Sequence, residues 1–413
     1  MFANVARSRL LPMSVPFRYF GAAVALHIAA WAALLAGARD VAAFPGGLGW
    51  PFAALHLATL GVLAMAAIGA TLQLLPVATR QPVRSVGAAK LVWWLFVPGV
   101  LLFGGGAAAY APRAMAPGAV LALAALSLYG WLLARNLWSA RGMPVVVAHG
   151  WAALAALAGL AFTGLALVAR YEHGLALDHS AFRVAHLVLA AYGFMGLLAL
   201  GLSQFLLPML AVARPPAPRS AYAALGTALA AILLALGGFL GAAALAGLVA
   251  AAIHVVSLER SLRARLRPAL GPAFQLVRAS WALLLASLAL ALAMALGWAP
   301  PRAGVLFIVL LVPGWLLTFL LGVLQRIVPF LASVHAGARA PPLASALSPQ
   351  GPLAAHRVLH FAALAGLLAG VALDALWLVQ VAAAAGLAGA LAFAAFFAGV
   401  LGRLKSARVP AHA

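Results

Sequence analysis

Residues 54–80 read ALHLATLGVLAMAAIGATLQLLPVATR, an apolar run with one histidine, His56, near its start and Gln73 shortly before Pro76. A run of this length can cross a bilayer, whose hydrocarbon core needs about 20 apolar residues in a helix. The whole chain has the same character, because 67% of its 413 residues are hydrophobic and only 8% are charged. This composition excludes a water-soluble globule and predicts an integral membrane protein.

Charged and proline-rich breaks divide the chain into twelve apolar runs, each long enough to cross a membrane. The predicted spans are 17–38, 50–78, 87–110, 115–137, 144–168, 183–212, 220–240, 242–258, 276–298, 303–333, 356–374 and 376–402. Arg7 and Arg9 precede the first run, but its length and its lack of a clear cleavage site favour a membrane span over a signal peptide. We therefore predict an all-α membrane protein with twelve transmembrane helices.

The basic residues predict how the chain is oriented. If the N-terminus is cytoplasmic, only five of the 26 Lys and Arg residues fall outside: Arg39, Arg113, Arg170, Arg183 and Arg302. The positive-inside rule then places both termini in the cytoplasm, and we expect a bacterial-type inner membrane. The net charge of +21 reports this topology and requires no nucleic acid as a partner. Membrane lipids are the expected partners, with anionic headgroups beside the basic segment 257–274.

A repeated pattern of glycine and proline groups the spans. Three stretches share a Gly, a second Gly eight residues later and a Pro seven residues after that, with a Gln close before the Pro: GVLAMAAIGATLQLLP (61–76), GFMGLLALGLSQFLLP (193–208) and GWLLTFLLGVLQRIVP (314–329). They occupy the second, sixth and tenth spans. Small residues let helices approach closely, and Pro favours a helix end, so each feature alone has a structural explanation. Their recurrence every four spans predicts three related units, approximately 17–137, 144–258 and 276–402, within one membrane domain.

Two phrases carry a resemblance to a known family: LHLATLG...GATLQLLPV in the second span and AHLVLAAYGFMGLLALGLSQFLLPM in the sixth. They resemble the catalytic subunit of haem–copper oxidases and, more distantly, the twelve-span haem and copper proteins of the nitric oxide response. The resemblance implies twelve helices in three quasi-equivalent four-helix arcs. It also implies that His56 is a low-spin haem ligand and that His186 is a copper ligand.

The ligand set implied by this resemblance is incomplete. The family's seventh span carries adjacent histidines and its tenth span carries haem ligands, but 220–240 and 303–333 contain no histidine. A complete oxygen reductase is therefore not expected. We expect a haem protein that transfers electrons or senses or handles a diatomic gas, with a redox protein or a quinol as partner.

Histidines are the main candidate ligands because the chain has no cysteine. Neutral imidazoles on facing helices can bind haem iron from both sides. His27, His56 and His186 are predicted in the outer half of the membrane and form the preferred haem site, with His360 as a ligand at a second site. His356 and His360, four residues apart, share a helix face and with His186 are the candidate metal ligands, with copper as one candidate metal.

Several of these histidines also have a structural explanation. A hydrogen bond to a neighbouring helix would account for His27 and His254, and contact with lipid headgroups would account for His356 and His360. The segment RYEHGLALDHSAFR (170–183) is expected to be a solvated loop, with a weak copper or zinc site as the alternative.

Two other functional classes stay open. A twelve-span secondary transporter fits the span number, although carriers usually repeat in two halves and commonly place carboxylates in mid-membrane. A scaffold or assembly protein without a cofactor fits the missing ligands. Bound haem would argue against the scaffold, and substrate uptake without haem would favour the carrier.

Overall fold

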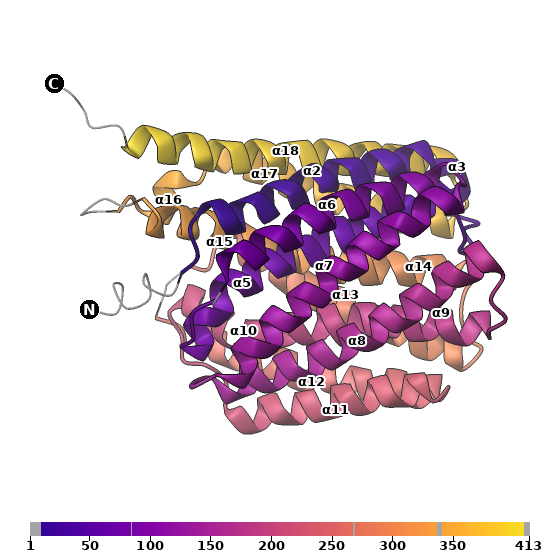
Figure 1. Ribbon diagram of the computed structural model, residues 1–413, viewed down its shortest axis with the longest axis horizontal. Coiled ribbons are helices and arrows are strands. Elements are labelled where there is room, and N and C mark those ends of the chain that lie inside the picture. The colour runs from indigo at the N-terminus through magenta and orange to yellow at the C-terminus, as the bar shows by residue number, and fades with distance from the viewer. Residues whose placement is uncertain (1–9, 84, 267–268, 337–340, 409–413) are drawn as a thin grey trace.

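The computed structural model describes residues 10–83, 85–266, 269–336 and 341–408. Within them, twelve helices are long and apolar enough to cross a membrane, as the hydropathy pattern predicts (Figure 1). Among the basic residues predicted to face the cytoplasm, Arg7, Arg9, Arg84, Arg267 and Arg339 lie outside the described residues. The chain is thus a multi-pass helical membrane protein.

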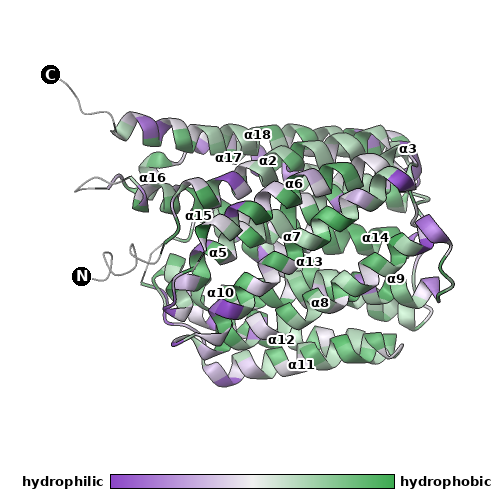
Figure 2. Ribbon diagram, in the orientation of Figure 1, coloured by the Kyte–Doolittle hydropathy of each residue, from purple (hydrophilic) through white to green (hydrophobic). Residues whose placement is uncertain are grey.

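Nine spans are continuous α-helices: α2 (Ser14–Ala36), α6 (Val86–Ala108), α7 (Pro112–Trp138), α8 (Pro144–His173), α11 (Pro218–Leu236), α12 (Leu240–Arg263), α13 (Pro272–Ala295), α17 (Gln350–Ala372) and α18 (Leu376–Arg408). The short helices α3 (Ala38–Val41) and α16 (Ala344–Leu347) lie in connections. Figure 2 shows apolar residues through the middle of the bundle and hydrophilic residues gathered towards its two ends.

The second, sixth and tenth spans each contain a π-helical segment. The second consists of α4 (Trp50–His56), η1 (Leu57–Ala64) and α5 (Met65–Thr79); the sixth of α9 (His179–Val188), η2 (Leu189–Gly196) and α10 (Leu197–Ala211); the tenth of α14 (Ala303–Val309), η3 (Leu310–Leu317) and α15 (Thr318–Val334). The first glycine of each repeated stretch is the fifth residue of its π segment. π-helices are rare and frequently mark functional sites, so their recurrence at one place is a specific feature of this fold.

The repeated glycines pack against the span that precedes them. A Cβ added to Gly61 would lie 3.0 Å from Leu26 Cβ, and one added to Gly69 would lie 2.6 Å from Tyr19 Cβ, both on α2. In the second stretch Gly193 and Gly201 meet Ala156 and His149 on α8, and in the third Gly314 and Gly322 approach Leu283 and Leu276 on α13. In each unit the two partners are seven residues apart, which is about two helical turns. The glycines therefore allow close helix packing, as the structural explanation predicts.

The same order of helix contacts recurs along the chain. The helix pairs α6 with α7, α11 with α12, and α17 with α18 form extensive contacts, and α18 also packs along α2 (Figure 1). At the centre, η3 contacts both η1 and η2. The grouping of the helices into three arcs stays a prediction.

Two predicted boundaries change in the structure. The segment 170–183 is mostly helical, because α8 continues to His173 and α9 begins at His179, so the connection shortens to 174–178. The eleventh span begins at Gln350 and not at residue 356. His356 therefore lies about 9 Å along that helix, at 1.5 Å per residue, and its side chain is fully buried. His360 is buried as well, so the expected contact of His356 and His360 with lipid headgroups is wrong.

Candidate functional site

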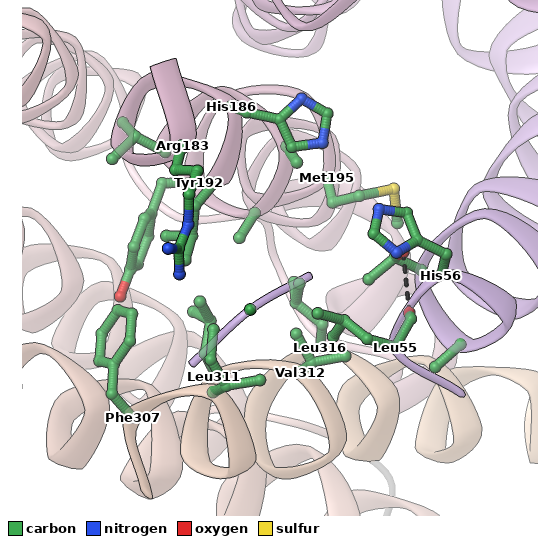
Figure 3. Close-up of a pocket in the computed structure, with 18 of the residues that line it drawn as sticks. Leu55, His56, Arg183, His186, Tyr192, Met195, Phe307, Leu311, Val312 and Leu316 are labelled. Carbon is green, nitrogen blue, oxygen red and sulfur yellow. Dashed lines mark hydrogen bonds between the residues drawn. The ribbon is translucent and has the colours of Figure 1, made fainter. Parts of the chain in front are cut away.

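A cavity of about 1200 Å³ lies inside the bundle, with largely apolar walls. His56 and His186 line it together with Met195 and Tyr192 (Figure 3). His27 also reaches its wall, from α2. The described residues that line the cavity include four histidines, since His179 at the start of the sixth span lines it as well, and no Asp or Glu.

His56 is the last residue of α4, immediately before η1. Its Nδ1 lies 3.0 Å from the carbonyl oxygen of Phe52, one turn earlier. A carbonyl oxygen only accepts, so Nδ1 carries the proton and Nε2 keeps a lone pair. Two phenyl rings fix the imidazole plane: Phe52 stacks on it at 4.0 Å and Phe103 meets it edge-on at 5.1 Å, between ring centroids.

His186 lies on α9, near the start of η2. Its Nδ1 is 3.5 Å from the hydroxyl oxygen of Thr163 on α8. The Thr163 hydroxyl donates to the carbonyls of Gly159 and Leu160, so its oxygen accepts the proton of Nδ1. Gly164 leaves room beside the ring, since a Cβ there would lie 3.3 Å from His186 Cε1. His186 Nε2 therefore also keeps its lone pair.

The two imidazoles face each other at a separation suited to a shared metal ion. Their ring centroids are 6.5 Å apart and the ring planes differ by 33°. Two imidazoles bound to opposite sides of one iron have centroids roughly 6 Å apart, because each metal–nitrogen bond is about 2 Å long. In Figure 3 the Met195 side chain extends towards His56. The donor set therefore fits a haem with two axial imidazoles, each oriented through its Nδ1.

One end of the cavity carries a positive charge. Arg183 lines the cavity and donates from Nη2 to the carbonyl oxygen of Pro45, at 2.7 Å. The loop residue Gly46 adopts φ +88° directly against this guanidinium, where a Cβ would lie 2.6 Å from Nη2. A guanidinium has five N–H donors, so Arg183 can also bind an anionic group such as the carboxylate of a ligand.

His27 belongs to a second group of histidines, apart from the predicted outer site. Its ring centroid is 6.5 Å from that of His356, which in turn stacks with His360 at 5.6 Å. Trp31 Nε1 donates to His27 Nε2 at 3.0 Å, and His356 Nδ1 donates to the carbonyl oxygen of Gly389 at 3.0 Å. His27 is thus held by its own helix and not by a neighbouring one.

Polar atoms of this second group are left without partners. His27 Nδ1 and His356 Nε2 are buried and make no hydrogen bond, whereas His360 Nε2 lies 2.7 Å from the hydroxyl oxygen of Thr318. The three residues predicted to bind metal are divided, because His186 contacts His56 while His356 and His360 contact each other. Among the described residues, no group of three or more His, Asp or Glu side chains is arranged to hold a metal ion.

Of the other two buried histidines, His254 has both ring nitrogens in hydrogen bonds, whereas His149 has a buried Nε2 without a partner. Gln204, from the repeated stretch, donates its amide to His254 Nδ1 at 3.1 Å, and His254 Nε2 donates to Ser203 at 3.2 Å. Both ring nitrogens of His254 are thereby used in bonds to another helix, as its structural explanation predicts. His149 donates from Nδ1 to the Val145 carbonyl at 2.8 Å.

Asp178 caps α9 and shows no sign of a metal site. Its carboxylate accepts from the backbone N–H groups of Ser180 and Ala181, at 3.0 and 3.1 Å. These bonds, that from Ala181 above all, lower the pKa of the carboxyl. The Asp178 and His179 pair therefore has a helix-capping explanation.

Sequence reasoning missed the residues that orient the two imidazoles. Thr163 is a single hydroxyl in the apolar run 144–168, and it directly precedes Gly164. An isolated Thr-Gly pair in such an apolar run was the sequence feature that could have indicated a polar contact with another helix. Phe52 and Arg183 carried no periodic signal, because their roles depend on contacts between distant helices.

Comparison of the chain with protein-family models finds no match, and comparison with curated proteins finds none either. The functional assignment therefore depends on the chemistry of the cavity.

Proposed function

We propose that the protein binds a haem between His56 and His186 and uses it for electron transfer in the membrane. The opposed imidazoles carry this proposal: their centroids are 6.5 Å apart, and both Nδ1 atoms are tied to acceptors so that both Nε2 lone pairs are free. When bound, such a haem would supply one-electron redox chemistry.

The chain's own residues would position the group. Phe52 and Phe103 hold the His56 ring, Thr163 holds the His186 ring, and Arg183 offers donors to a carboxylate at the edge of the cavity. The apolar walls exclude water, which favours electron exchange over reactions with solvent. Sensing or handling of a diatomic gas is the second form of this proposal, with His56 and His186 again as the residues that would hold the haem.

The resemblance to haem–copper oxidase catalytic subunits agrees with a haem on the second span. We extend it only to His56 and His186. The proposed location is a bacterial-type inner membrane with cytoplasmic termini, supported by the distribution of basic residues. The lack of carboxylates among the described residues lining the cavity favours a redox role over an ion-coupled carrier.

Absorption spectra of the purified protein test the proposal, recorded oxidised and after reduction with dithionite, with a pyridine haemochrome assay and metal analysis on the same sample. We expect stoichiometric haem in the wild type and its loss or conversion to a different spectrum in His56→Ala and His186→Ala. His173→Ala, at an exposed position, is the matched control. Reproducible absence of haem after expression with ample haem supply would refute the proposal and leave transport or a scaffold role.

A further inference from the structure

The cavity continues beyond the histidine pair into a lobe bounded by α11, α12 and α13. Its walls there include Ala231 of α11, Ala244 and Ala251 of α12, and Leu284 and Leu288 of α13. Every described residue that these three helices contribute to the cavity is apolar. A volume of about 1200 Å³ also exceeds the roughly 300–1000 Å³ of a pocket for one small ligand. The cavity is therefore larger than a pocket for one small ligand, and these three helices line its apolar part.

A hydroxyl group reaches the α13 wall of this lobe. The Tyr192 oxygen lies 3.4 Å from Ser287 Oγ, and Ser287 is flanked by the lining residues Leu284 and Leu288. Ser287 donates its own proton to the Leu284 carbonyl at 2.8 Å. The Tyr192 hydroxyl therefore donates to Ser287 Oγ across a long contact, and its proton can turn from Ser287 to an acceptor oxygen of a ligand.

An aromatic pair lies beside the hydroxyl. Tyr192 of η2 stacks on Trp315 of η3, with centroids 5.6 Å apart and planes 29° apart, and both residues line the cavity. Stacked aromatic rings favour a flat ring as their neighbour. The lobe thus combines a hydroxyl, an aromatic surface and an apolar space, all within the membrane bundle.

We propose that this lobe binds a membrane quinone, with a ring oxygen accepting from the Tyr192 hydroxyl and the isoprenoid tail lying between α11 and α13. The cavity-lining residues that α11, α12 and α13 contribute carry no charge, and Arg302, which follows α13 and also lines the cavity, is paired with Asp374. This favours a neutral headgroup over that of a phospholipid. The choice of a redox-active ring rests on the proposed haem function, since the two ligands would share one cavity. The binding site itself stands on the cavity, the hydroxyl and the aromatic pair.

Binding can be measured directly with a benzoquinone that carries one isoprenoid unit. The purified protein is titrated with this probe, and saturable quenching of tryptophan fluorescence gives Kd. Ala244→Phe fills the lobe and is expected to weaken binding at least tenfold. Tyr192→Phe removes the hydroxyl and is expected to weaken it severalfold. Ala242→Phe places the same ring at an exposed position of α12 and should leave Kd unchanged.

The following outcomes would overturn the proposed quinone site. No saturable binding to the wild type, or equal Kd values for wild type, Ala244→Phe and Tyr192→Phe, overturns the quinone site. Release of a copurified phospholipid by Ala244→Phe, without any effect on the probe, overturns it in favour of a lipid site. If Ala244→Phe does not fold, Tyr192→Phe decides. The titration is repeated with His56→Ala: retained binding without haem separates failure of the haem assignment from failure of the quinone site.

Discussion

The imidazole rings of His56 and His186 lie 6.5 Å apart although one ends α4 and the other lies on α9, four spans later in the chain. Neither ring is positioned by the other. His56 is held by the Phe52 carbonyl of its own helix, and His186 by the Thr163 hydroxyl of α8. Their separation is therefore set by helix packing before any ligand binds, which is the preorganisation that a rigid axial pair requires.

Thr163→Val is expected to weaken haem binding by about 10–100-fold, the usual effect of removing a partner that orients a ligand. Valine has a similar shape but cannot accept the proton of His186 Nδ1. Haemin titration of the haem-free protein measures the affinity. Thr163→Ser keeps the hydroxyl and should stay close to wild type; equal affinities for the Val and Ser variants would show that Thr163 does not orient His186.

Gly69→Ala and Gly201→Ala are expected to destabilise the protein, each by about 1–3 kcal/mol, the usual cost of overpacking. Their added Cβ atoms would press on Tyr19 of α2 and His149 of α8, respectively. Gly226→Ala has open space around the new Cβ on α11 and should stabilise by about 0.5–1 kcal/mol through helix propensity. Denaturant unfolding in mild detergent measures all three. Similar values for Gly226→Ala and the other two variants would contradict close packing at the repeated glycines.

Trp31→Phe is expected to cost about 1–3 kcal/mol, because it leaves His27 Nε2 buried without its donor. Packing of the indole is lost as well, so the pair is best tested by a double-mutant cycle with His27→Phe. We expect a coupling energy of about 0.5–3 kcal/mol between the two substitutions. Trp138→Phe, at a position 83% exposed, controls for loss of an indole. Additive effects of the two substitutions would argue against the hydrogen bond.

Acid is expected to weaken the α9 cap through Asp178. Hydrogen bonds from Ala181 and Ser180 lower the pKa of this carboxyl in the folded protein. Its contribution to stability is therefore fully present above the unfolded pKa of about 3.9 and is lost as the pH falls through the lower folded pKa. Thermal unfolding midpoints between pH 2.5 and 6 (roughly the range spanning carboxyl titration) measure the effect.

The control for this prediction is Asp178→Asn, which can still cap the helix but does not titrate. The difference in midpoint between wild type and Asp178→Asn should shrink as the pH falls below about 3.9. A difference that does not change with pH would show that Asp178 does not contribute in its ionised form.

Hydropathy predicted the spans because burial in lipid demands long apolar helices whatever their neighbours are. The glycine and proline spacing likewise located the three spans that contain π segments. The π segments themselves escaped prediction, since the extra residue in a wide turn leaves no mark on an apolar pattern. A sequence that is apolar on every side gives little indication of which face meets which helix.

The lack of information on which helix faces meet also explains why the histidines were grouped only in part correctly. His27 was grouped with His56 and His186 because all three were predicted at a similar depth in the membrane. In the structure, the orientation of α2 places the His27 ring beside that of His356. For His56 and His186, the predicted shared site and the observed ring pair agree in placing them together. Thr163 and Arg183 act across helix contacts, which a single sequence does not record.

Each π segment adds one residue to its span, and one residue corresponds to a turn of about 100° around a helix axis. The two halves of the second, sixth and tenth spans consequently follow separate helical phases. In the second span, His56 precedes this phase change and Gly69 follows it, so the ligand-bearing half and the packing half can each face their own neighbours. Deleting a single residue within η1 would rotate one half of the span relative to the other. Either the His56 imidazole or the glycine face that packs against α2 would then lose its present orientation. A helical wheel drawn for any of these spans must therefore begin again after its π segment.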